Sequence, residues 1–311
     1  MIPFFFFLFG IVIGSFLNVC ISRIPEGESV VSPASRCPRC KAPIKPYDNV
    51  PILGWLWLRG KCRNCALPIS PMYPIIEFLT GAVFVLTYIR FDVTLSTFKW
   101  LFFSCILIVL IVTDLRVRLL PDAVVWPGFG IGLVLATRIP TDDPAGFMLL
   151  GMLQRAVPPS FYEYAYQTHP VLLSAALGFL DALLGAAFGA FLLWAAAALY
   201  KLFRKREGMG MGDVKMMAMV GAFLGVTGSF LTILLGTLLG SVIGVLFIAG
   251  LYAYGWKRDL AVRAGRRGLG QIDSLRWAIV SKYQIPLGTF LGIAALLVVY
   301  ALPYLFSLLP H

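Results

Sequence analysis

Four cysteines near the start of the chain form two C-x2-C pairs. Cys37 and Cys40 make the first pair, and Cys62 and Cys65 make the second after a gap of 21 residues. This spacing is typical of a zinc ribbon, in which each C-x2-C turn brings two thiolates to one tetrahedral ion. Four cysteine ligands fill the coordination sphere, so the pattern predicts a structural zinc that folds the loop and takes no part in catalysis. A redox pair and unliganded thiols are the alternatives.

Two aspartates stand at the ends of apolar runs, far apart in the sequence. Asp114 closes one run and Asp213 opens another. Ionisable groups at the edge of a membrane are costly, so each needs an explanation. Two carboxylates that meet there can share a proton, with one acting as general base on a water and the other as general acid. The alternative is that each aspartate caps a helix or pairs with Arg116 or Lys215.

Other acidic residues offer weaker candidates. Asp122 competes with Asp114 as a partner for Asp213, but it also suits the N-cap of a helix, which is the preferred interpretation. Asp181 lies deep in an apolar run and is expected to form an interhelical hydrogen bond. Glu77 lies in an apolar run on the side that faces the cysteine loop. With 2 histidines in the chain, catalysis by a histidine triad has little material.

The composition indicates the solvent in which these residues work. The chain has 311 residues, of which 59% are hydrophobic and 13% charged, with a mean hydropathy of +0.85. A soluble globule cannot cover its surface with so little charge, so lipid surrounds much of the chain. The net charge of +11 is read as a topology signal of loop Lys and Arg, so no nucleic-acid partner is expected.

Apolar runs long enough to approach a membrane span occur eight times. They cover residues 1–21, 74–89, 98–113, 123–137, 171–200, 214–227, 229–254 and 285–306. The first run lacks a preceding basic residue and is expected to be an uncleaved span. The fold class is therefore an all-α polytopic membrane protein of about eight transmembrane helices with a small zinc-stabilised cytoplasmic loop domain.

Basic residues set the orientation of this helical array. With eight spans, 22 of the 26 Lys and Arg residues fall on one side, which the positive-inside rule assigns to the cytoplasm. Both termini then lie outside. The expected parts are the first span (1–21), the cysteine loop domain (22–73) and a helical membrane domain (74–311). The last includes an exoplasmic insertion at 138–170 and a basic cytoplasmic loop at 255–284.

Several motifs, taken in order, resemble the type IV prepilin peptidases, which are bifunctional leader peptidases and N-methyltransferases. The motifs are GSFLNVC at 14–20, RIP at 23–25, the two C-x2-C pairs, PILGW at 51–55, YPIIE at 73–77, the stretch from Asp114 to LLPD at 119–122, and GMGDVK at 210–215. The resemblance covers about residues 10–135 and 200–250. The insertion 138–170 and the loop 255–284 look longer than the usual connections of the family.

The resemblance implies a function. It assigns Asp114 and Asp213 as the catalytic pair of an aspartic endopeptidase of the GxGD class, in the bacterial inner membrane with its active site facing the cytoplasm. The substrates are prepilins or pseudopilins, cleaved after the Gly that ends a short basic leader. The new N-terminal residue, usually Phe, is then methylated with S-adenosylmethionine. The methyl donor site is unknown, with Glu77 as a candidate participant.

Two alternatives remain open from the residues themselves. A non-enzymatic membrane transporter or assembly scaffold would use Asp181, Glu77 or the edge aspartates as ion sites. The absence of a visible inverted repeat speaks against it. A peptidase of archaeal preflagellins is a further option, although the cysteine loop suits the bacterial form better.

Overall fold

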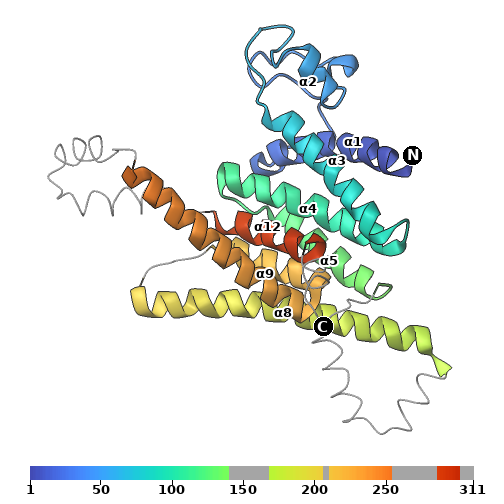
Figure 1. The fold of residues 1–311 in the computed structure, drawn as a ribbon, viewed down its shortest axis with the longest axis vertical. Coiled ribbons are helices and arrows are strands. Elements are labelled where there is room, and N and C mark those ends of the chain that lie inside the picture. The colour runs from blue at the N-terminus through green and yellow to red at the C-terminus, as the bar shows by residue number, and fades with distance from the viewer. Residues whose placement is uncertain (140–167, 206–209, 254–285, 302–311) are drawn as a thin grey trace, which may run out of the picture.

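The computed structural model describes residues 1–139, 168–205, 210–253 and 286–301, which are mostly helical (Figure 1). The helices are α1 (Ile2–Arg23), α2 (Leu53–Trp57), α3 (Met72–Phe91), α4 (Leu95–Val117), α5 (Asp122–Ala136), α8 (Pro170–Arg204), α9 (Met211–Ala253) and α12 (Leu287–Tyr300), with 3-10 turns at Ile24–Glu26 and Pro46–Asp48. Within the described ranges, extended pairing is limited to two isolated bridges in the cysteine loop. The expected all-α class is confirmed.

Five helices are long and apolar enough to cross a membrane. They are α1, α3, α4, α8 and α9 as far as Phe247, while α5 and α12 are shorter apolar helices. Large apolar side chains on these helices face outward, including Phe5 at 60% and Phe98 at 65% exposure. Water would penalise such a surface, so lipid must cover it. The protein is a multi-pass helical membrane protein.

Helix α9 reverses its direction at Gly225. This residue has φ 72° and ψ −168°, a backbone conformation that is open essentially to glycine alone. Gly189 on α8 lies against both Met217 and Ser229, whereas Gly185, one turn earlier, lies against the backbone of Gly225. The two arms of α9 therefore run in opposite directions along α8. When the two arms of α9 are counted separately, the described residues form eight apolar helical segments, which is the number that the sequence predicts.

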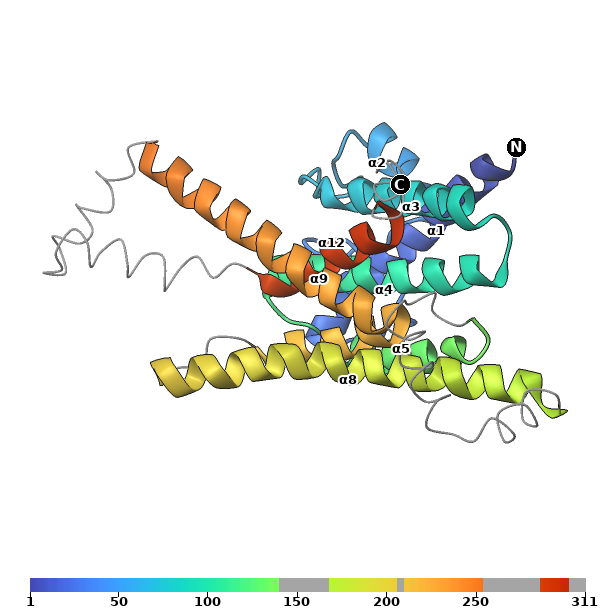
Figure 2. The ribbon, with the colours of Figure 1, turned by 60° about the horizontal axis from the view of Figure 1, so that its bottom comes forward.

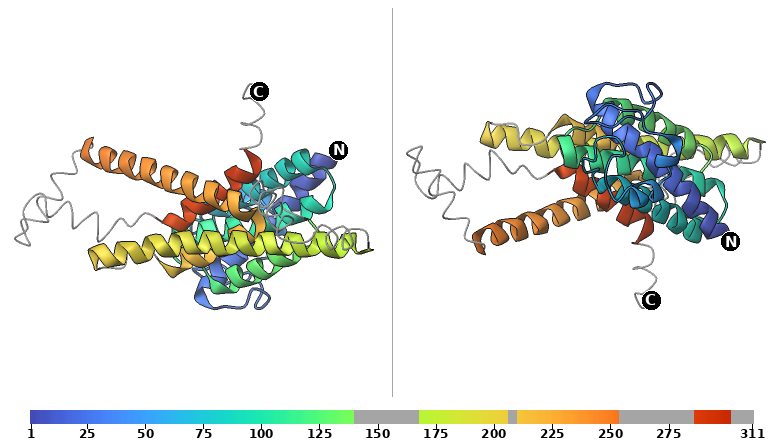
Figure 3. Two further views of the ribbon diagram at one scale, coloured as in Figure 1. Left: turned by 90° about the horizontal axis from the view of Figure 1, so that it is seen from below. Right: turned by 90° about the horizontal axis from the view of Figure 1, so that it is seen from above.

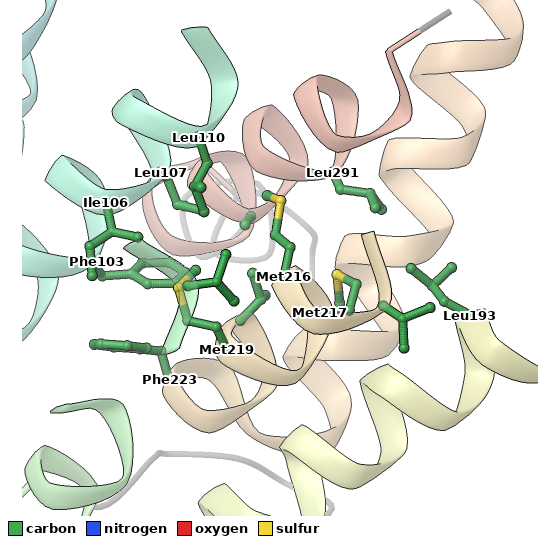
Figure 4. Close-up of a cluster of buried hydrophobic side chains, with 14 of the residues drawn as sticks. Phe103, Ile106, Leu107, Leu110, Leu193, Met216, Met217, Met219, Phe223 and Leu291 are labelled. Carbon is green, nitrogen blue, oxygen red and sulfur yellow. The ribbon is translucent and has the colours of Figure 1, made fainter. Parts of the chain in front are cut away.

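The first arm of α9 forms the hub of the apolar core (Figure 4). Met216, Met217 and Met219 are fully buried there against side chains of α4, α8 and α12. Phe223 stacks on Phe103 of α4, with ring centroids 4.7 Å apart. Unbranched methionines fill irregular gaps between helices. The hub fixes the arm that begins at Asp213.

The remaining helices cover this hub. The long helix α8 crosses one face of the bundle, at the bottom in Figure 2 and in front when the molecule is seen from below in Figure 3. On the other side, α1 and α3 pack together beneath the cysteine loop and α2 (Figure 1). Contacts described below join the end of α4 to the starts of α5, α9 and α12, so these helix ends gather at one edge.

For two segments expected from the sequence, the structure offers no comparison. Most of the exoplasmic insertion 138–170 and all of the basic loop 255–284 lie outside the described residues.

Candidate active site

The two edge aspartates lie at helix ends. Asp114 occupies the last turn of α4, which closes where Arg118 adopts a left-handed φ of 55° and donates its N–H to the Asp114 carbonyl at 2.9 Å. Asp213 occupies the first turn of α9, where its own N–H donates to the Gly210 carbonyl at 3.2 Å. Asp114 is buried, with 6% exposure, and Asp213 is half-buried. Both carboxylates are thus fixed by helix termini.

Helix α12 begins between these two carboxylates. A Cβ placed on Gly288 would lie 3.0 Å from Asp213 Oδ1 and 3.1 Å from Asp114 Oδ2. Because each oxygen lies about 3 Å from the same point, the two are no more than about 6 Å apart. The structure therefore brings together the two aspartates that the sequence singled out. Like charges at this range do not both ionise easily, which favours a shared proton.

A threonine holds one of the acids. Thr289 donates its backbone N–H to Asp114 Oδ2 at 2.7 Å and its hydroxyl to the same oxygen at 2.9 Å. The sequence interpretation missed both Gly288 and Thr289. A glycine and a threonine at the start of an apolar run carry no signal in residue type, and their role depends on which helix ends meet.

The neighbouring Lys215 pairs with a different acid. Lys215 donates to both oxygens of Asp122, at 2.9 and 2.8 Å. The alternative that Lys215 neutralises Asp213 is therefore wrong. The N-cap interpretation of Asp122 is also wrong by one position, since Pro121 is the N-cap of α5 and Asp122 is its first residue. An acidic residue there still suits the positive end of the helix dipole.

The four cysteines converge in the loop between α1 and α3. The sulfur atoms of Cys37, Cys40, Cys62 and Cys65 all lie within 4.8 Å of one another. The Cys37–Cys65 and Cys40–Cys62 sulfur pairs are each 4.0 Å apart. In a tetrahedral zinc site with Zn–S bonds of about 2.3 Å, the sulfur atoms lie about 3.8 Å from one another. The donor set could therefore hold a metal ion.

Two matching turns position these thiols. The backbone carbonyl of Cys37 accepts the N–H of Lys41, and the carbonyl of Cys62 accepts the N–H of Ala66, both at 2.9 Å. Lys41 and Ala66 both have positive φ, near 59° and 56°. Hydrogen bonds from the Ala42 backbone and the Asn64 side chain lower the pKa of the Cys40 thiol to about 6. A thiol that ionises readily is a better metal ligand.

An ion pair fastens the second turn to the rest of the loop. Arg63 donates to both carboxylate oxygens of Asp48, at 2.8 and 2.6 Å. This bidentate pair lowers the pKa of Asp48, first through the hydrogen bonds and then through the charge of the guanidinium. The pair joins the 3-10 turn at Pro46–Asp48 to the Cys62–Cys65 turn, so it braces the cysteine cluster.

Glu77 lies beneath the cysteine loop, near the start of α3. It is 7% exposed, and its Oε2 accepts the backbone N–H of Ile52 at 2.7 Å. Nearby, Asn18 donates to the Tyr73 carbonyl at 3.1 Å. These contacts tie the loop to the helices, and they do not reveal a binding site for a methyl donor.

Two family models match the chain. The Bacterial Peptidase A24 N-terminal domain matches residues 8–91, which contain the four cysteines, and the Type IV leader peptidase family matches residues 101–245, which contain both aspartates. The chain belongs to the type IV leader peptidase family. The first match ends at the last residue of α3. The resemblance seen in the sequence is confirmed.

Named relatives agree with this membership. The chain is 35% identical over 244 residues to the Prepilin leader peptidase/N-methyltransferase of Myxococcus xanthus, covering 78% of this chain and 62% of that protein. It is 33% identical over 263 residues to the protein of the same name from Aeromonas hydrophila, covering 77% and 79%. For the Neisseria gonorrhoeae protein of that name the identity is 32% over 260 residues, covering 76% and 79%. No solved structure matches the chain.

Proposed function

We propose that this protein is a membrane aspartic endopeptidase that removes the short basic leader of type IV prepilins or pseudopilins after Gly, and then N-methylates the new N-terminal residue. Asp114 and Asp213 are its catalytic pair. The protein works in the bacterial inner membrane, with the active site at the cytoplasmic face. The relatives' names support both activities.

The observation that carries the peptidase assignment is the meeting of two acids from distant helices. Asp114 and Asp213 face one another across Gly288, and Lys215 pairs with Asp122 rather than with either acid. A transporter places its ion sites near the bilayer midplane, whereas these two acids lie at the end of α4 and the start of α9. Hydrolysis by an aspartic pair directly explains why two carboxylates meet there.

The proposed reaction needs only the two acids and a water molecule. One carboxylate takes a proton from the water as the water oxygen bonds to the scissile carbonyl carbon, and the other acid gives its proton to the carbonyl oxygen. When the resulting diol collapses, the first acid protonates the leaving nitrogen and the diol returns a proton to the second. The pair ends in its starting state.

The location of the pair suits a substrate that stays in the membrane. The apolar helix of a prepilin docks against the spans, while its basic leader rests near the anionic cytoplasmic leaflet. The scissile bond then lies at the membrane edge, where α4 ends and α9 begins. The excess of Lys and Arg in the segments on that side supports the orientation.

Zinc fits the cysteine cluster through its donor set and its sulfur spacing. When bound by Cys37, Cys40, Cys62 and Cys65, the ion supplies folding energy and leaves no open coordination position for chemistry. The braced turns and the Asp48–Arg63 pair hold the four sulfur atoms in place.

We assign no residue to the methyl donor, S-adenosylmethionine. Beside the cysteine loop lies a groove of about 380 Å³, lined by Trp55, Pro71, Pro74, Ile75, Phe78 and Leu79. Its lining is apolar and lacks the polar groups that a charged sulfonium and a ribose require. This groove therefore does not fit S-adenosylmethionine. Glu77 is already engaged by Ile52.

Mass spectrometry of the N-terminus of a co-expressed prepilin tests the proposal, because it reports cleavage position and methylation together. Asp114→Asn and Asp213→Asn should each abolish cleavage in membranes. Asp122→Asn is the matched control, since this acid pairs with Lys215 and should leave the cleavage position unchanged. Full cleavage by either catalytic-pair variant would refute the assignment.

A further inference from the structure

Helix α12 contributes two donors to a single oxygen of the acidic pair. The N–H and the hydroxyl of Thr289 both lie within 2.9 Å of Asp114 Oδ2. Thr289 is 2% exposed, so water does not compete for these bonds. Two donors on one oxygen stabilise the ionised form of a carboxylate.

The hydroxyl of Thr289 has one proton and two acceptors in reach. The Asp114 oxygen is 2.9 Å away, whereas the Ile111 carbonyl is 3.4 Å away. The shorter distance selects the carboxylate as the acceptor. The hydroxyl therefore adds to the N–H on the same oxygen.

Asp213 has a different environment. In the described ranges, no side chain donates a hydrogen bond to its carboxylate, and its nearest basic neighbour along the helix, Lys215, pairs with Asp122. The two acids are thus held unequally. We propose that Thr289 is a positioning residue that fixes Asp114 as the ionised member of the pair and leaves Asp213 to carry the shared proton.

This inference rests on the proposed peptidase function and assigns the two roles within it. Asp114 is the general base that takes the proton from water, and Asp213 is the general acid that protonates the scissile carbonyl oxygen. On collapse of the diol, Asp114 passes its proton to the leaving nitrogen and Asp213 recovers its own. Thr289 exchanges no proton with the substrate and acts only through Asp114.

Two substitutions separate the hydroxyl from the backbone donor. Thr289→Val keeps the shape and the N–H but removes the hydroxyl, and Thr289→Ser keeps both donors. Thr113→Val is the matched control, because Thr113 is buried beside Asp114 but its hydroxyl bonds the carbonyls of Val109 and Leu110 within its own helix.

The assay is cleavage of a prepilin by the purified full-length protein, with kcat and KM measured separately. Loss of one hydrogen bond to a charged group predicts a fall in kcat of roughly 10- to 100-fold for Thr289→Val. Its KM should stay within about twofold, because substrate binding is unchanged. Thr289→Ser should restore kcat, and Thr113→Val should match the unmodified protein.

Three results would overturn the inference: a normal kcat for Thr289→Val, a serine variant as slow as the valine variant, or a fall confined to KM. Thermal unfolding of Thr289→Val and Thr289→Ala is measured alongside. Failure of both to fold would also overturn it, since the hydroxyl would then serve the fold. Asp114→Asn and Asp213→Asn in the same series keep the two ideas apart. If both are inactive while Thr289→Val is normal, only the positioning role fails.

Discussion

Gly288→Ala offers a sharp test of how the two acids are spaced. The added methyl group would lie 3.0 Å from Asp213 Oδ1, 3.1 Å from Asp114 Oδ2 and 3.0 Å from the Leu120 side chain. Ordinary contacts begin near 3.4 Å, so the surrounding groups must yield by a few tenths of an ångström. The same methyl group would fill the space between the carboxylates, where a reacting water must fit.

The change should separate activity from stability. Alanine is favoured over glycine in a helix by about 0.5–1 kcal/mol, so the fold has no intrinsic reason to weaken. A displacement of reacting groups approaching 1 Å costs about 100-fold in rate, or about 2.7 kcal/mol of barrier. Because the two carboxylates yield by only a few tenths of an ångström each, we expect a kcat for prepilin cleavage lower by up to about 100-fold, with a thermal midpoint close to that of the unmodified protein.

Initial rates of cleavage by the purified protein measure the first quantity, and thermal unfolding measures the second. Gly240→Ala is the control, because its Cβ would meet Phe290 of the same helix α12 at an ordinary 3.4 Å. An unchanged kcat for Gly288→Ala would show that the active pair adopts a different spacing, and the geometric reasoning would fail.

Two further predictions address the metal cluster and the hairpin of α9. Cys37→Ser removes one of four sulfur ligands, so it should abolish zinc binding and impair methylation more than cleavage. Metal analysis of the protein and mass spectrometry of the processed prepilin measure these effects. Absence of zinc from the unmodified protein would contradict the prediction. Gly225→Ala forces a side chain into a backbone conformation that costs roughly 1–3 kcal/mol, so thermal unfolding should show a lower midpoint. An unchanged midpoint would mean that the reversal at this residue is not required.

Much of the fold could be predicted because lipid imposes a simple rule on the sequence. Each apolar run became a helix, and even the break within the long run after Asp213 was expected, at residue 228. The structure places the reversal at Gly225, where the backbone conformation requires glycine. The exact position depends on contact with α8, which hydropathy does not report.

The candidate site was only partly predictable. The acids and the cysteines could be found from the sequence, because charge in a membrane is costly without a partner and the spacing of two C-x2-C pairs is typical of a metal site. Gly288 and Thr289 could not be found in this way. Their side chains are ordinary in an apolar helix, and they matter only because α12 begins where α4 ends. Similarly, the partner of Lys215 is Asp122 rather than Asp213, a choice made by helix packing.

The two acids, Gly288 and Thr289 all lie in helical turns, and none of them lies in a loop that connects helices. The last turn of α4 and the first turns of α9 and α12 are held in position by the buried, methionine-rich cluster around Met216. The connections between these turns can therefore lengthen or shorten during evolution without altering the chemistry.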